Sequence, residues 1–563
     1  MKKIILFLLL PLQLFAQDNT ELIHYIDSLT TPLNKIDAPG AVLLVAKDGK
    51  PIYRKAYGMA SLEFGVPTRP DHRFCIGSVS KQFCAIAILQ LASQGKLNLQ
   101  DDIRKYLPEF NTHGRLITIE HLITHTSGIP STENRDYADL MYTTNSMSNK
   151  DVLDYAMQKD LLFEPGTDFS YNNIGFTMAA IIAERVSGMS YREYLEKNIF
   201  QPAGMVNTFL PVETIPLYNL ATSYQKNAEG KWIKYSADKW TDSKGRGGII
   251  STIDDLLLWY KALLEEKVLS KEWIEKAWKS FTLKDGRSTN YGFGWRVQQF
   301  NGYRIVSHGG AKFGYRTGSY YIPEKNIYIA YANFFEANPD ILPAKIIWKL
   351  LEQEAPTPSK QPTLPLNDYE GVYKMHSMGA RLVTQMSDGP MYHYITYQND
   401  SLFMQNTGGT KIYMRPYVKD VFMPAGNDIV AYYFKRNESG KVIAIYSKGF
   451  VTNTGPITDE PKVNQSMNEE PAPVNMSSDI TKKYIGTYYN VVLDEFKKIE
   501  FKNNKLFLMD AGEAIELIPL SENRFALKSI CNSFMEFNLN NKKEIILKTT
   551  DIRTWEYKRV SDF

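Results

Sequence analysis

The chain has 563 residues, of which 44% are hydrophobic and 23% charged, and its formal net charge at pH 7 is +3. This length exceeds what one hydrophobic core supports, so we expect two to four domains. The near-neutral charge and the absence of a long basic stripe argue against a nucleic-acid partner.

Cysteine and histidine are scarce. Cys75, Cys84 and Cys531 are too few for a disulfide framework, and we expect Cys75 and Cys84 to be buried apolar residues. The eight histidines fall at no ligand-like spacing. We therefore expect neither a metal site nor a cofactor.

The first residues have the pattern of a secretory signal peptide. Two lysines precede an apolar run from Ile4 to Phe15, and the small residue Ala16 follows. The run is shorter than the roughly 20 residues of a membrane span, and an uncleaved anchor is the alternative. We expect a signal peptide over residues 1–16, export across the inner membrane, a periplasmic protein, and no integral membrane segment after cleavage.

Residues 18–355 have the pattern of one mixed domain. A helical stretch over 18–36 precedes two apolar runs around Asp48-Gly49, which predict a β-hairpin. Helical patterns dominate from Lys81 to about Lys267. Strand patterns return over 291–299, 303–307 and 317–333, and a last helix covers 343–354. This order predicts an α/β (α+β) domain whose mainly antiparallel sheet is flanked by helices.

Two proline-rich linkers, 352–365 and 452–479, separate the rest of the chain into segments that look like copies. Both segments open with Tyr-x-Gly-x-Tyr, at Tyr369 and at Tyr484. Short strands with regular turns predict two small all-β barrels over 366–452 and 480–563. Their role is open between spacing and shaping access to a catalytic cleft.

The motif Ser78-Val79-Ser80-Lys81 is the first candidate for chemistry. On a helix, residues three apart share a face, so the Lys81 amine can take the proton of the Ser78 hydroxyl. The same spacing recurs at Ser93, Ser223 and Ser236, so spacing alone is weak. Only Ser78 has a glycine before it and a long apolar helix after it; a capping serine is the alternative.

Two later motifs can complete the site. In Tyr171-Asn172-Asn173, the Tyr171 phenol can relay a proton and the Asn173 amide can bind substrate, or the two can be a core tyrosine and a capping residue.

In Ser307-His308-Gly309-Gly310-Ala311, the paired glycines permit close approach of a substrate backbone. The N–H groups of Ser78 and Ala311 can then form an oxyanion hole. His308 assists or orients Tyr171, unless it is an ordinary turn histidine.

These three motifs, in this order, resemble the serine β-lactamase and penicillin-binding-protein superfamily. The chain is most similar to class C β-lactamase-related hydrolases, with partner motifs Tyr-x-Asn and His-x-Gly. The runs Phe74–Phe83, His121–Gly128, Gly247–Thr252 and Tyr291–Trp295 also agree. A catalytic unit followed by two lipocalin-like barrels resembles the D-aminopeptidases of this superfamily.

The resemblance implies that Ser78 is the acylated nucleophile, Lys81 and Tyr171 are the acid/base pair, and Asn173, His308, Gly309 and Gly310 line the substrate. His308 stands where β-lactamases of this class carry lysine, so it offers a weaker, pH-dependent anchor for a carboxylate. We therefore expect an exported serine hydrolase of small peptides, amides or esters, of D-aminopeptidase type. The alternatives are a carboxylesterase or weak β-lactamase, and a non-hydrolytic penicillin-binding or peptidoglycan-recognition protein.

Overall fold

The computed structural model describes residues 20–130, 149–157, 160–211, 217–227, 230–234, 244–300, 302–312, 314–333, 341–352, 365–375, 392–407, 409–426, 430–449, 460–463, 474, 476–477, 482–490, 495–510, 513–530, 533–540, 544–550 and 554–560. The predicted signal peptide and Cys531 lie outside these residues. Among the described residues, no helix has the length and apolar character needed to cross a bilayer.

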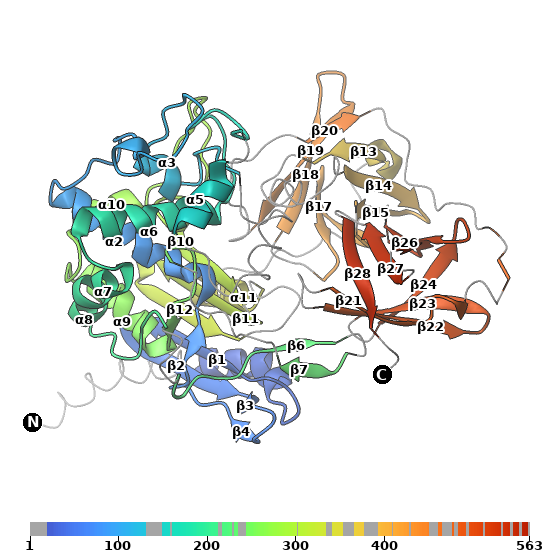
Figure 1. Cartoon of the computed structure of the whole chain (residues 1–563), viewed down its shortest axis with the longest axis horizontal. Coiled ribbons are helices and arrows are strands. Elements are labelled where there is room, and N and C mark those ends of the chain that lie inside the picture. Colours follow the sequence, from blue (N-terminus) through green and yellow to red (C-terminus); the bar gives the residue numbers. More distant parts are fainter. Residues whose placement is uncertain are drawn as a thin grey trace, which may run out of the picture.

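The first part of the chain is built on a six-stranded antiparallel sheet in the order β2-β1-β12-β11-β10-β9 (Figure 1). Its strands are β1 Ala41–Lys47, β2 Lys50–Tyr57, β9 Arg296–Phe300, β10 Tyr303–Lys312, β11 Tyr315–Ile322 and β12 Ile327–Ala332. Three small two-stranded sheets accompany it: β3 Met59–Ser61 with β4 Val66–Pro67, β5 Phe74–Cys75 with β8 Ile250–Ser251, and β6 Tyr224–Lys226 with β7 Trp232–Lys234.

Helices cover both faces of the large sheet. The described helices and helical turns are residues 20–30, η1 Thr31–Leu33, η2 Gly77–Val79, α2 Ser80–Ser93, η3 Ile103–Lys105, α3 Ile119–Ile123, α5 Asn149–Met157, α6 Asn173–Ser187, α7 Tyr191–Leu195, η4 Glu196–Phe200, α8 Gln201–Ala203, α9 Ile253–Leu264, α10 Lys271–Ala277, η5 Pro323–Lys325, α11 Ile341–Leu350 and η6 Leu366–Tyr369. The main core contains α2, α6 and α9, while α11 and the helix at 20–30 pack on the opposite face.

The alternation of side chains along β1 explains the two cores. Val42 and Leu44 point into the main core, whereas Leu43 and Val45 point into the second. Successive side chains of a strand face opposite sides, so a continuous apolar run fits a sheet that is covered on both faces. The hairpin prediction is confirmed: Asp48 (φ 52°) and Gly49 (φ 71°) turn between β1 and β2, as an Asp-Gly turn requires.

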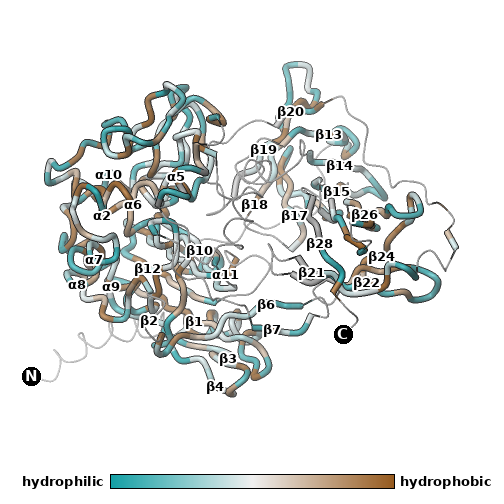
Figure 2. Tube along the Cα trace, in the orientation of Figure 1, coloured by the Kyte–Doolittle hydropathy of each residue, from teal (hydrophilic) through white to brown (hydrophobic). Residues whose placement is uncertain are grey.

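Helix α2 runs through the middle of the main core. From Ser80 to Leu91 each of its residues is buried, including Lys81 and Gln82. Figure 2 shows this helix in hydrophobic colours among more polar surface segments. Beyond its polar first turn, α2 has apolar side chains on most sides and is therefore enclosed, which places Lys81 inside the molecule.

The C-terminal part forms two closed eight-stranded antiparallel barrels, as predicted. The first barrel contains β13 Gly371–Lys374, β14 Tyr392–Gln398, β15 Ser401–Asn406, β16 Ile412–Val418, β17 Val421–Pro424, β18 Val430–Arg436, β19 Val442–Gly449 and β20 Glu460–Val463. The second contains β21 Gly486–Asn490, β22 Glu495–Lys502, β23 Lys505–Asp510, β24 Glu513–Pro519, β25 Arg524–Leu527, β26 Phe534–Leu539, β27 Ile545–Thr550 and β28 Thr554–Val560. Strand β20 pairs with β13 and β19, so the first barrel extends past the predicted boundary at 452 into the second linker.

The repeated Tyr-x-Gly-x-Tyr motif has the same structure in both barrels. The Tyr373 hydroxyl donates to the Tyr369 carbonyl oxygen at 2.7 Å, and the Tyr488 hydroxyl donates to the Tyr484 carbonyl oxygen at 2.9 Å. Both donor side chains are fully buried. The motif therefore closes the first strand of each barrel onto the segment that precedes it.

Within the described residues, contacts join the sheet domain to the first barrel and the two barrels to each other. Val430 of β18 packs against the second core of the sheet domain. The barrels meet at a bridge between Thr410 and Ile530, where the Gln405 side-chain amide also donates to the Ser529 carbonyl oxygen at 3.2 Å. In Figure 1 the barrels lie together on one side of the sheet domain.

Candidate active site

Ser78 and Lys81 meet where the turn η2 enters helix α2. The Lys81 Nζ atom lies 3.1 Å from Ser78 Oγ, within hydrogen-bond distance. Gly77 opens the turn with φ 50°, in the left-handed region that favours glycine. The spacing thus brings the two predicted residues together.

The Lys81 amine also lies within hydrogen-bond distance of two oxygen atoms, which can only accept. Its Nζ is 2.7 Å from Asn173 Oδ1 and 2.8 Å from the Arg246 carbonyl oxygen, and the side chain is fully buried. A neutral amine has two N–H bonds and one lone pair. If the two acceptors take the N–H bonds, the lone pair is left for the Ser78 hydroxyl.

Two other copies of the Ser-x-x-Lys spacing lie within the described residues, and their side chains have other neighbours. The Ser93 hydroxyl donates to the Gln90 carbonyl oxygen at 2.9 Å. The Lys226 ammonium lies 5.3 Å from the centre of the Trp232 ring. Ser236 and Lys239 lie outside the described residues.

Tyr171 stands beside Lys81, just before helix α6. The Lys81 Nζ atom is 4.8 Å from the centre of the Tyr171 ring. The Asn172 side chain accepts the Gly175 N–H and caps the helix, which leaves Asn173 to face Lys81. The capping interpretation thus fits Asn172, while Tyr171 and Asn173 join the Ser78 site.

His308 lies in strand β10 with a buried ring. Its Nδ1–H donates to the Gly309 carbonyl oxygen at 2.6 Å, and its Nε2 is 3.0 Å from the Tyr291 hydroxyl. Burial lowers the pKa of His308 well below its ordinary value, and the charges of Arg296 and Lys81 lower it further. The sequence predicts a weaker, pH-dependent anchor for a carboxylate at this position; the burial of the ring favours its neutral form, because a buried charge has no water to stabilise it.

Gly310 lets the catalytic turn approach β10. A Cβ atom on Gly310 would lie 2.0 Å from the Ile76 carbonyl oxygen and 3.2 Å from the Ser78 nitrogen. A Cβ atom on Gly77 would lie 2.7 Å from the Ala311 nitrogen. The two main-chain nitrogens predicted to form an oxyanion hole are therefore on segments in direct contact.

Strand β10 changes its neighbours at the site. Its first half pairs with β9 from Tyr303 to Ser307, whereas from His308 to Lys312 only the β11 register continues. A Cβ atom on Gly309 would meet only the Thr317 carbonyl oxygen, at 3.8 Å. The residues of β10 that are predicted to bind substrate therefore begin at His308, just beyond the part of β10 that pairs with β9.

Three groups at the site had no role in the sequence prediction: the Arg246 carbonyl, the Tyr291 hydroxyl and the His125 ring. All three lie in or beside the runs that carry the family resemblance, which was the available signal. His125 is buried and its ring centre is 4.3 Å from that of Tyr171.

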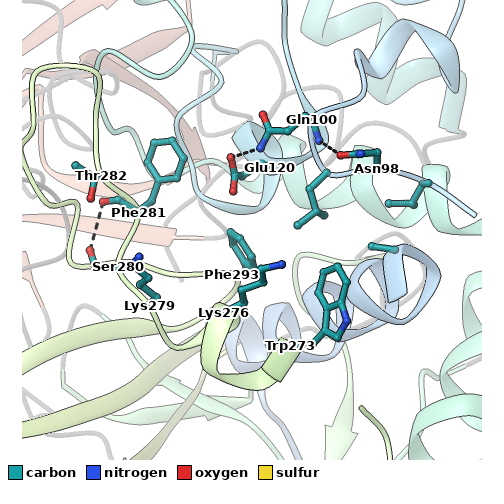
Figure 3. Close-up of a pocket in the computed structure, with 13 residues that line it drawn as sticks. Asn98, Gln100, Glu120, Trp273, Lys276, Lys279, Ser280, Phe281, Thr282 and Phe293 are labelled. Atoms are coloured by element: carbon teal, nitrogen blue, oxygen red, sulfur yellow. Dashed lines mark hydrogen bonds between the residues drawn. The ribbon is translucent and has the colours of Figure 1, made fainter. Parts of the chain in front are cut away.

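A separate cavity of about 560 Å³ lies elsewhere on the sheet domain. Figure 3 shows residues that line it, among them Gln100, Glu120, Trp273, Phe281 and Phe293. None of the predicted site residues lines this cavity. Within the described part of the chain, no cluster of three or more His, Cys, Asp or Glu side chains is arranged to hold a metal ion.

Comparison with known proteins gives consistent matches. The profile described as Beta-lactamase matches residues 26–345. Penicillin-binding protein 4* of Bacillus subtilis is 32% identical over 290 residues, which cover 49% of this chain and 63% of that protein. The chain therefore spans less than two thirds of this relative.

Solved structures extend the likeness of the fold. A penicillin-binding protein from Bacillus halodurans is 26% identical, with a TM-score of 0.50, over 58% of this chain and 98% of its own. The octameric penicillin-binding protein homologue from Pyrococcus abyssi is 23% identical, with a TM-score of 0.54, over 87% of this chain and 98% of its own. The latter likeness concerns the fold alone, and it reaches beyond the sheet domain.

Proposed function

Because the chain belongs to the β-lactamase family, we propose that it is a serine hydrolase that acts through a Ser78 acyl-enzyme on small peptides, amides or esters, with a D-aminopeptidase type of activity. The observation that carries the proposal is the buried Lys81 amine, 3.1 Å from Ser78 Oγ and fixed by two acceptors. A lysine held in this way activates a serine hydroxyl when it is neutral.

In the first half-reaction, Ser78 Oγ attacks the carbonyl carbon of the substrate while its proton moves to the Lys81 amine. The negative charge that develops on the carbonyl oxygen is stabilised by the N–H groups of Ser78 and Ala311. As the tetrahedral intermediate collapses, the carbon–leaving-group bond breaks. The amine or alcohol leaves with a proton delivered through Lys81 and Tyr171.

In the second half-reaction, water attacks the acyl-enzyme. Its proton passes to the same Lys81–Tyr171 pair and then returns to Ser78 Oγ as the acid product leaves. Asn173 orients Lys81 through its Oδ1 atom at 2.7 Å, and it lies beside the substrate. Gly309 and Gly310 leave the main chain of β10 open to an extended acyl group.

The neutral ring of His308 favours peptides, amides and esters over β-lactams. An efficient β-lactamase of this type binds the drug carboxylate with a cation at this position, whereas burial keeps His308 uncharged. In our proposal His308 orients the part of β10 that binds the substrate, because its ring holds the Gly309 carbonyl and the Tyr291 hydroxyl.

Covalent labelling tests the nucleophile. Intact mass after treatment with a fluorophosphonate, and separately with a fluorescent penicillin, is expected to show one adduct that Ser78→Ala abolishes. Ser93→Ala is the matched control, since Ser93 shares the spacing but bonds Gln90, and it is expected to label like the wild type. An adduct at another residue, or none with either probe, would overturn the assignment.

A substrate panel separates the activities. Rates with D- and L-aminoacyl amides, short-chain p-nitrophenyl esters and nitrocefin are compared, and turnover of aminoacyl amides is expected to be fastest. Preference for the esters would support the carboxylesterase alternative instead. A stable penicillin adduct without turnover of any compound would support a penicillin-recognition protein.

A further inference from the structure

We propose that His125 is a positioning residue, which fixes Tyr171 by holding the main chain on both sides of it. The inference rests on the proposed function only in that Tyr171 is there the proton relay. It goes beyond that function because His125 contacts neither Ser78 nor Lys81 through any hydrogen bond that the structure describes.

The first observation is a pair of hydrogen bonds. The His125 carbonyl oxygen accepts the Ser170 N–H at 2.9 Å. The His125 ring accepts the Asn172 N–H at Nδ1, also at 2.9 Å. Ser170 and Asn172 are the two neighbours of Tyr171 in the chain, so one residue holds the main chain before and after the tyrosine.

The second observation is the packing of the ring. Its centre lies 4.3 Å from that of Tyr171 and 4.7 Å from that of Tyr291. Phe176 contacts it at 5.1 Å. The ring therefore limits the movement of the Tyr171 side chain as well as of its backbone, because closely packed rings exchange rotamers only if their neighbours move.

The third observation is the state of the ring. Since Nδ1 accepts a hydrogen bond, the proton of the neutral ring is on Nε2. Burial lowers the pKa of His125 well below its ordinary value, and the nearby Lys81 acts in the same direction. The ring thus stays a neutral acceptor, which is what the bond to Asn172 requires.

The fourth observation is the backbone. His125 has φ 62°, in the left-handed region that asparagine, aspartate and histidine adopt more readily than other residues with a Cβ atom. It is buried with an Nε2 atom that finds no partner within the described residues. A residue that only filled space here would be apolar and without an orphaned polar atom, so the acceptor at Nδ1 is the feature that needs histidine.

Three substitutions distinguish the role of the hydrogen-bond acceptor at His125 Nδ1 from that of the volume of the side chain. His125→Asn keeps an acceptor, Oδ1, near the position of Nδ1 and tolerates the positive φ. His125→Gln moves the acceptor outward by one bond, and His125→Leu removes it at similar volume. Thermal unfolding of each variant identifies losses that come only from misfolding.

Steady-state kinetics on the best aminoacyl amide of the panel provide one readout. We expect His125→Leu to lower kcat by about tenfold or more with KM within about threefold, because a misplaced relay slows chemistry more than binding. His125→Asn is expected to recover most of kcat, and His125→Gln less. Equal kcat in the Asn and Leu variants, at equal stability, would overturn the proposal.

Hydrogen exchange measured by mass spectrometry on the peptide around residues 170–172 gives a readout that needs no activity. Exchange is expected to rise in His125→Leu and His125→Gln but to stay near the wild-type rate in His125→Asn. An unchanged exchange rate of this peptide in His125→Leu would overturn the proposal that His125 holds the main chain around Tyr171, even if the variant is active. Failure of the proposed function is seen separately, as a wild-type protein that forms no adduct at Ser78.

Discussion

At Gly77 and Gly310 the turn that carries Ser78 touches strand β10 through main-chain atoms alone. A Cβ atom on Gly310 would lie 2.0 Å from the Ile76 carbonyl oxygen, which is far inside the contact distance. No side chain therefore separates the turn of Ser78 from the strand. The short distance between this turn and β10 thus depends on glycine at both positions.

Gly310→Ala is expected to push the turn away from β10. Overpacking of a rigid contact costs about 1–3 kcal/mol, and the displaced Ser78 should react with a fluorophosphonate at least about tenfold more slowly. The steric control is Gly309→Ala, whose Cβ meets only an atom at 3.8 Å. The control should unfold at nearly the wild-type temperature, and an equal loss of stability in both variants would contradict the explanation.

The sequence could predict those contacts of the site that join residues close to each other in the chain. Ser78 and Lys81 are three residues apart on one helical turn, so their meeting follows from helix geometry. The role of the Arg246 carbonyl could not be assigned from its residue type, because every residue has a main-chain acceptor; only the neighbouring run Gly247–Thr252 indicated this segment. The neutral state of His308 also depends on burial, which is decided by how distant elements pack.

Among the elements, the short helix α3 shows how a histidine can replace the usual acidic cap. The Thr118 hydroxyl accepts the His121 N–H, and the His121 ring accepts the Thr118 N–H in return. This is a capping box with histidine in place of glutamate or glutamine. Burial lowers the pKa of His121 to about 4, and the charge of Lys284 contributes.

His121 makes stability depend on pH. Below about pH 6.5 this histidine is protonated in the unfolded chain, whereas in the folded chain it is protonated only near pH 4. Stability is therefore complete above pH 6.5 and falls as the pH drops to 4, by roughly 3 kcal/mol at most. His121→Gln keeps the cap without the titration.

Urea midpoints followed by tryptophan fluorescence at pH 7.5, 6.0 and 4.5 measure this effect. The wild type should lose more stability than His121→Gln over this range. His125 and His308 remain in both proteins, so the residual acid sensitivity of the variant is expected to have the same sign. Parallel curves for the two proteins would exclude His121 as the source.

The barrel motif gives a second prediction for elements. Tyr373→Phe and Tyr488→Phe each leave a carbonyl oxygen without its buried donor, at a cost of about 1–3 kcal/mol. Because the two motifs have the same structure, the losses should be similar and each confined to its own barrel. Limited proteolysis of the two barrels reports them separately, and a loss in only one would show that the copies differ in energetics.

The first barrel also contains a strand that the sequence pattern did not predict. The repeated Tyr-x-Gly-x-Tyr indicated two copies, and their short strands with regular turns predicted both barrels. The short closing strand β20, however, falls in a segment with the composition of a linker. Its pairing with β13 and β19 depends on closure of the whole barrel and not on its own four residues.

On the scale of the whole molecule, the sheet domain carries nearly all of its own core. Among the described residues, the main core consists of positions up to 332, and the barrel residue Val430 packs against the second core. A chain truncated after residue 355 is therefore expected to fold, with a modest loss in thermal stability, and to label at Ser78. A folded but unlabelled truncation would mean that the barrels complete the site.

The half of β10 that β9 leaves uncovered has a second consequence. An open strand edge is a place where another chain can pair, and such edges favour aggregation. Here the turn of Ser78 stands against that edge at Gly310, and Lys312 ends it with a charge. The turn and the charge therefore restrict the pairing of a further strand along this half of β10.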